Sequence, residues 1–125
     1  MKEKILFVCK HNRFRSKVAE AYFNKINKNE NLMAESAGIF QGRPISPYTK
    51  KAARELEIIL KGQPRAISTK LLSKINMIII VADNVSKKIF YYGDKCPQKL
   101  IVWKISDASI YNKKEIQRSI KKIIK

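Results

Sequence analysis

The chain has 125 residues, of which 45% are hydrophobic, and its 27 basic and 10 acidic side chains give a formal net charge of +17. This length suits one domain, residues 1–125, and no apolar run is long enough for a membrane span or a signal peptide, so we expect a cytoplasmic protein without a membrane partner. Two widely spaced cysteines and one histidine exclude a disulfide framework and lack the paired spacing of metal ligands.

The first third of the chain predicts a strand, a helix and a second strand. Residues 5–8 form a continuous apolar run, which is typical of a strand buried on both faces of a parallel sheet. Residues 16–27 place apolar side chains at helical spacing. Residues 32–36 then predict a second strand, which ends at Gly38.

The rest of the chain continues this alternation. Ser46 and Pro47 form a strong helix start, and we expect that helix to run through Ile59 towards Gly62. Further on we expect short helices at residues 68–74 and 85–90, strands at residues 77–82 and 100–103, and a last helix at residues 115–124. Alternating strands and helices indicate an α/β fold, in which ligands bind at the carboxyl ends of parallel strands.

The loop between the first strand and the first helix carries the chemistry. Its residues are Cys9, Lys10, His11, Asn12, Arg13, Phe14, Arg15 and Ser16. A helix N-terminus presents unpaired backbone N–H groups and the positive end of the helix dipole, so it favours anions. Arg15 adds a planar fork for two phosphate oxygens, and the same positive field favours Cys9 as a thiolate nucleophile. Ser16 can donate a hydrogen bond to that sulfur.

This pattern of Cys9, five residues, Arg15 and Ser16 after the first strand resembles the phosphate-binding loop of the low-molecular-weight protein tyrosine phosphatases. That family is joined to the thioredoxin-coupled arsenate reductases. The likeness continues in the expected order at residues 17–20, 36–38, 77–82 and 105–108. It implies a three-layer α/β fold, with a four-stranded parallel sheet in the order 2-1-3-4 and helices on both faces.

The resemblance also implies a role for each residue of the site. Cys9 would attack phosphorus and form a phosphocysteine, and Asp107 would protonate the leaving oxygen and then activate water. Asn12 would hold the loop in a left-handed backbone conformation, supported by a hydrogen bond from Ser36. The phosphate would be bound by the Arg15 side chain and by the loop residues Lys10, His11, Asn12, Arg13, Phe14, Arg15 and Ser16. No metal or other cofactor is implied.

The implied reaction is hydrolysis of a phosphate monoester, with phosphotyrosine in a protein as the first choice and a small phosphate ester as another substrate. Ala108 replaces the proline that usually follows the family's acid, so other carboxylates are rivals to Asp107. Asp83 is the reserve candidate because it follows a strand, and Asp94 is the other rival.

Arsenate reduction by the same loop is the first alternative. Cys9 would then work with Cys96 or with an external thiol such as thioredoxin. Arsenate reductases of this type carry two relay cysteines, whereas here Tyr92 stands at the earlier position and only Cys96 remains. Cys96 is therefore either an inert thiol or a partner that forms a disulfide with Cys9.

The net charge of +17 supports a second alternative, a catalytically weak module that binds phosphate or another polyanion. His11, at a position where the family often has glycine, and Ala108 are further reasons to keep it. The basic residues are spread along the chain, however, and no nucleic-acid-binding motif accompanies them. We therefore do not expect a nucleic-acid partner.

Overall fold

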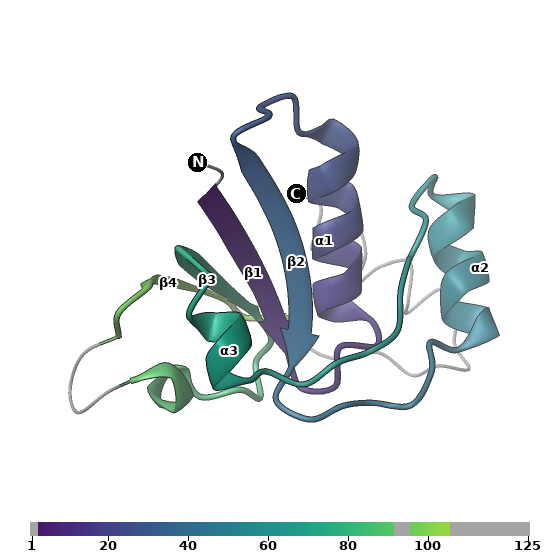
Figure 1. Ribbon diagram of the computed structural model, residues 1–125. Helices are drawn as coiled ribbons and strands as arrows, with labels where there is room; N and C mark the ends of the chain where they lie inside the picture. The colour runs from purple at the N-terminus through teal and green to yellow at the C-terminus, as the bar shows by residue number, and fades with distance from the viewer. Residues whose placement is uncertain (1–2, 92–95, 106–125) are drawn as a thin grey trace.

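The strand β1 (Glu3–Cys9) pairs with a neighbour on each side, as its continuous apolar run predicts. In the computed structural model, which describes residues 3–91 and 96–105, β1 lies between β2 (Leu32–Gly38) and β3 (Met77–Val81). The strand β4 (Lys99–Trp103) pairs with β3 and completes a parallel sheet in the order β2-β1-β3-β4 (Figure 1). The predicted sheet and strand order are confirmed.

Alternate side chains of β1 enter two separate cores because successive residues of a strand point to opposite faces. On one face, Ile5 and Phe7 join a core with the helices α1 (Arg15–Ile26) and α2 (Pro47–Glu55). On the other face, Leu6 and Val8 join a core that includes Phe90. The helix α3 (Thr69–Leu72) and the short 3-10 helix η1 (Lys87–Phe90) cover that second face (Figure 1). Helices therefore lie on both faces of the sheet, as expected.

The starts of α2 and α3 follow local capping signals in the sequence. The Oγ atom of Ser46 accepts a hydrogen bond from the Tyr48 N–H (3.2 Å), and Pro47 stands at the first helical position. Ser68 caps α3 in the same way through the Leu71 N–H (3.1 Å). These contacts confirm the predicted N-cap of α2.

The end of α2 was not predicted correctly, because the helix stops at Glu55 and does not continue through Ile59. Glu57 takes a left-handed conformation with φ 63°. The Ile58 N–H then donates to the Ala53 carbonyl (2.9 Å), which closes the last turn of the helix. This turn buries Ile58 in the core and leaves Ile59 60% exposed.

The other short elements lie where they were expected, although α3 and η1 are shorter than the predicted helices at residues 68–74 and 85–90. The predicted helix at residues 115–124 lies outside the described residues. In the part of the chain that the structure describes, no helix is long and apolar enough to cross a membrane.

The carboxyl ends of the strands bring distant residues to one edge of the sheet. Cys9, the last residue of β1, stands opposite Gly38 in the register with β2. On the other side, the Asp83 N–H donates to the carbonyl of Ile105 (3.1 Å), which ties the ends of β3 and β4 together. The loop that follows β1 lies at this edge.

Candidate active site

The loop from Cys9 to Arg15 is held in shape by Asn12, which is fully buried. Its φ of 56° confirms the expected left-handed conformation. The Asn12 Nδ2 donates to the Oγ of Ser16 (2.8 Å), and its Oδ1 accepts from the backbone N–H of Arg65 (3.0 Å). One side chain thus joins the loop, the start of α1 and a segment more than fifty residues away.

Cys9 and Ser16 lie in direct contact inside the loop. The Cys9 Sγ is 3.0 Å from the Ser16 Oγ, and both residues are at least 98% buried. Because Asn12 donates to a lone pair of the Ser16 hydroxyl, the hydroxyl hydrogen is available to the sulfur. Ser16 can therefore donate a hydrogen bond to a Cys9 thiolate.

Arg15, the first residue of α1, is the largest of the fully buried side chains. Its Nη1 donates to the carbonyl of Ile105 (2.8 Å), and its Nη2 donates to the Oδ1 of Asn84 (3.1 Å). The Oδ1 of Asp83 lies 3.7 Å from Nη1. These contacts fix the plane of the guanidinium at the carboxyl edge of the sheet, where a planar donor fork can bind an oxyanion.

The end of β2 and the segment that follows it pack against the loop, and this packing requires glycine at two positions. The Phe40 N–H donates to the Lys10 carbonyl (2.9 Å), and the Gly42 N–H donates to the His11 carbonyl (3.1 Å). A Cβ atom on Gly38 would lie 2.7 Å from the Asn12 nitrogen, and one on Gly42 would lie 2.5 Å from the His11 oxygen. No side chain fits at these distances, so both glycines are needed for the close approach.

The remaining loop side chains point in different directions. His11 is exposed, and its ring lies 6.1 Å from that of Phe40. The Arg13 Nη2 donates to the carbonyl of Pro44 (3.0 Å). Phe14 is buried in the core beside α1, so it contributes only backbone to the site.

Ser36 makes a different hydrogen bond from the one that the resemblance implies. Its Oγ donates to Glu20 on α1, and Asn12 bonds instead with Ser16 and Arg65. The Ser36 carbonyl accepts from the Nε of Arg65 (2.9 Å). Ser36 is therefore linked to Asn12 through Arg65, and the expected direct hydrogen bond is wrong.

Lys17 is a buried cation in the first turn of α1. Its side chain is 7% exposed, and its Nζ lies 3.9 Å from the Oε1 of Glu20. Burial is the largest influence and lowers the pKa of Lys17 from its ordinary value of 10.5. The charge of Glu20 opposes this effect, that of Arg65 adds to it, and that of Cys9 opposes it. Lys17 is thus within electrostatic reach of Cys9.

The expected general acid Asp107 and its rival Asp94 lie outside the described residues. Cys96 is half-buried against the core that contains Cys9, its Sγ lies 3.6 Å from the Oε1 of Gln98, and both cysteines are free thiols. Over residues 3–91 and 96–105, no cluster of three or more His, Cys, Asp or Glu side chains could hold a metal ion.

Comparison with known proteins is consistent with this geometry. The family model described as low molecular weight phosphotyrosine protein phosphatase matches residues 4–110. A search of curated proteins finds no match.

Solved structures share the fold over nearly the whole chain. The arsenate reductase from Archaeoglobus fulgidus is 27% identical, with a TM-score of 0.76 over 96% of this chain and 92% of that one. The low molecular weight protein tyrosine phosphatase from T. tengcongensis is 18% identical, with a TM-score of 0.83 over 98% and 93% of the two chains. The YwlE arginine phosphatase from Geobacillus stearothermophilus is 16% identical, with a TM-score of 0.83 over 98% and 86%.

Replacing Asn12 by alanine or by glycine separates its backbone role from its hydrogen bonds. Both variants leave buried polar partners unsatisfied, which lowers the free energy of unfolding by about 1–3 kcal/mol. Asn12→Ala adds the strain of a left-handed backbone with a Cβ atom, about 1 kcal/mol more. Urea unfolding should therefore rank wild type above Asn12→Gly and Asn12→Gly above Asn12→Ala. Equal stability of the two variants would show that the loop does not need positive φ here.

The lowered pKa of Lys17 predicts a pH-dependent stability. Between that lowered pKa and 10.5 the unfolded chain binds more protons than the folded one, so the free energy of unfolding rises with pH across this window. Lys17→Met keeps the apolar stem without the charge, so it should be more stable than wild type at neutral pH. The difference should shrink as the pH approaches 10.5, as measured by urea unfolding. Lys28→Met, at an exposed position, is the control, and a less stable Lys17→Met at neutral pH would contradict the prediction.

Proposed function

The chain belongs to the low molecular weight phosphotyrosine protein phosphatase family, and from this premise we propose that it hydrolyses phosphate monoesters through a phosphocysteine on Cys9. The observation that carries the proposal is the buried contact between the Cys9 Sγ and the Ser16 Oγ at 3.0 Å, at the start of a helix whose first residue is Arg15. Phosphotyrosine in proteins is the substrate we favour, and small phosphate esters are further substrates.

In the first step the Cys9 sulfur attacks phosphorus, the P–S bond forms and the P–O bond to the leaving group breaks. The charge on the equatorial oxygens is stabilised by the backbone N–H groups of the loop and by Arg15. Contacts with Ile105 and Asn84 hold the Arg15 guanidinium in one orientation, so little reorganisation accompanies the reaction. We assign the proton donor to the leaving oxygen as Asp107.

In the second step water attacks the phosphocysteine and the P–S bond breaks. Asp107 takes a proton from the water, and inorganic phosphate leaves. The sulfur departs as a thiolate, and the Ser16 hydroxyl can donate a hydrogen bond to it. Because the nucleophile must be a reduced thiol, we propose the reducing cytoplasm as its compartment.

Arsenate reduction is the second candidate. The likeness to the arsenate reductase from Archaeoglobus fulgidus favours it, at 27% identity over 96% of this chain. Cys9 would attack arsenic in the same loop and displace water, forming an As–S bond. A second thiol would then attack the Cys9 sulfur, and the As–S bond would break with its electron pair going to arsenic. A disulfide forms, and As(V) leaves as As(III). Cys96 packs against the core that contains Cys9, so it is the internal candidate, and thioredoxin or another thiol is the external one.

The first test is hydrolysis of para-nitrophenyl phosphate by freshly reduced protein without added metal. Cys9→Ser should lose the activity because a hydroxyl is a far weaker nucleophile than a thiolate, whereas Cys96→Ser should keep it. The same three proteins assayed for arsenate reduction with thioredoxin separate the two candidates. The reductase would be the better proposal if the wild type did not hydrolyse para-nitrophenyl phosphate but reduced arsenate, and if Cys96→Ser lost the arsenate reduction.

The identity of the general acid is tested by Asp107→Asn and Asp83→Asn. A general acid contributes about 10²–10⁴-fold, and more for poor leaving groups. Asp107→Asn should therefore lower kcat/KM more for phenyl phosphate than for para-nitrophenyl phosphate. Asp83→Asn removes the carboxylate near Arg15 and should lower the activity towards both substrates by the same factor. If the dependence on the leaving group follows Asp83 instead, that residue is the acid.

A further inference from the structure

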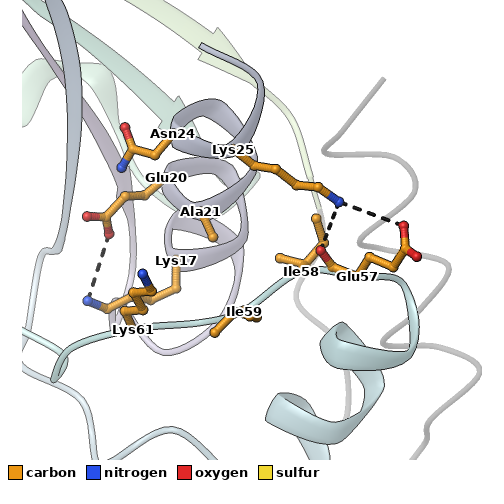
Figure 2. A pocket seen from close by; sticks show the side chains of 9 residues that line it. All are labelled: Lys17, Glu20, Ala21, Asn24, Lys25, Glu57, Ile58, Ile59 and Lys61. Atoms are coloured by element: carbon orange, nitrogen blue, oxygen red, sulfur yellow. Dashed lines mark hydrogen bonds and ion pairs between the residues drawn. The ribbon is translucent and has the colours of Figure 1, made fainter. Parts of the chain in front are cut away.

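A cavity of about 370 Å³ lies between α1 and the segment that follows α2, outside the phosphate loop. Figure 2 shows its lining, in which charged side chains from α1 face residues 57–61. Lys17, Lys25 and Lys61 bring three positive charges, and Glu20 and Glu57 bring two negative ones. The arrangement of these five groups decides what the cavity can bind.

One lysine and one glutamate of the lining already form an ion pair with each other. The Lys25 Nζ donates to the carbonyl of Glu57 (3.0 Å) and lies 3.9 Å from its carboxylate, at the rim of the cavity (Figure 2). The left-handed turn that ends α2 presents the Glu57 carbonyl and carboxylate to this lysine. Lys25 and Glu57 therefore add no net charge to the cavity.

The positive charges of Lys17 and Lys61 are less fully compensated by carboxylates of the lining. Among residues 3–91 and 96–105, the carboxylate that pairs with Lys17 is that of Glu20 at 3.9 Å, and Glu20 also accepts the hydrogen bond of Ser36. Figure 2 shows the ammonium groups of Lys17 and Lys61 at the same end of the cavity. A Cβ on Gly62 would be 3.3 Å from the Lys17 Nζ, so this ammonium lies directly against that segment. The lining thus places two ammonium groups at the end of the cavity where Glu20 lies.

Apart from Asn24, whose Nδ2 donates to the carbonyl of Ala34 (3.4 Å), the rest of the lining is apolar. Ile58 is 2% exposed and belongs to the core, whereas Ile59 is 60% exposed at the surface of the chain. Ala21 on α1 contributes a small side chain to the lining. A ligand that complements both parts has one anionic group and a compact apolar body.

We propose that this cavity binds a small organic anion, whose charged group lies between Lys17 and Lys61 and whose apolar body packs against Ile58 and Ile59. Binding there weakens binding of phosphate in the loop. Lys17 directly follows Ser16, whose Oγ lies 3.0 Å from the Cys9 Sγ, so an anion beside Lys17 reduces the positive potential at the loop. This coupling rests on the proposed function of the loop, but binding in the cavity does not.

The test is a titration of ¹⁵N-labelled protein with benzoate, followed by NMR, with benzamide as the uncharged control of the same shape. We expect saturable shifts at residues 17–25 and 57–61 with benzoate, and much weaker ones with benzamide. Lys61→Ala should weaken benzoate binding about fivefold, the size expected of one exposed charge pair. Lys74→Ala removes an exposed lysine that does not line the cavity and should change nothing.

Three results would overturn the site: shifts confined to residues 9–16, equal affinity for benzamide, or equal losses in Lys61→Ala and Lys74→Ala. The spectrum of each variant also reports whether it folds, and Lys17→Met provides a second test of the same charge cluster. Coupling is measured by titrating inorganic phosphate with and without benzoate, and benzoate should weaken phosphate binding. By linkage, phosphate should weaken benzoate binding by the same factor. A loop that binds no phosphate would contradict the proposed function and the coupling, while the benzoate data would still decide the cavity.

Discussion

The buried amide of Asn12 ties together the three segments around Cys9. It donates to Ser16 at the start of α1, and it accepts from the backbone of Arg65 beyond α2. The left-handed conformation of Asn12 lets the loop turn tightly after β1, and the close approach of Gly38 leaves no room for a different path. The positions of the Cys9 sulfur, its Ser16 partner and the guanidinium of Arg15 all depend on this turn.

The first turn of α1, directly after the loop, brings positive charge into the interior of the protein. Arg15 and Lys17 are both buried in the first turn of α1, where the helix dipole is also positive and no acidic residue is present. Such burial is unfavourable for folding unless the charges are paired. Arg15 pairs with Asp83 and donates hydrogen bonds to Asn84 and to the Ile105 carbonyl, and Lys17 pairs with Glu20. The positive end of the helix dipole adds to these charges, and this potential supports the anion sites that we propose in the loop and in the cavity.

Local patterns predicted most of the fold. The apolar run of β1, the Ser46–Pro47 start of α2 and the order of the elements agree with the structure. The end of α2 differs from the prediction because Glu57 adopts a left-handed conformation, which buries Ile58 in the core. Glutamate is not a typical turn residue, so no local pattern predicts this conformation. The contacts of the loop were also only partly predicted: Asn12 took the expected conformation, but its partner is Arg65 and not Ser36.

The sequence by itself was enough to propose the chemistry of the loop, from a cysteine, an arginine and a serine at this spacing between a buried strand and a helix. It also determined the parallel sheet, through the continuous apolar strands. Only the tertiary structure decided which distant residues form hydrogen bonds with that loop. Arg65, Asn84 and Ile105 come from separate connections and meet Asn12 and Arg15 because parallel strands end at one edge. Contacts of that kind depend on packing across the sheet, and no local pattern encodes them.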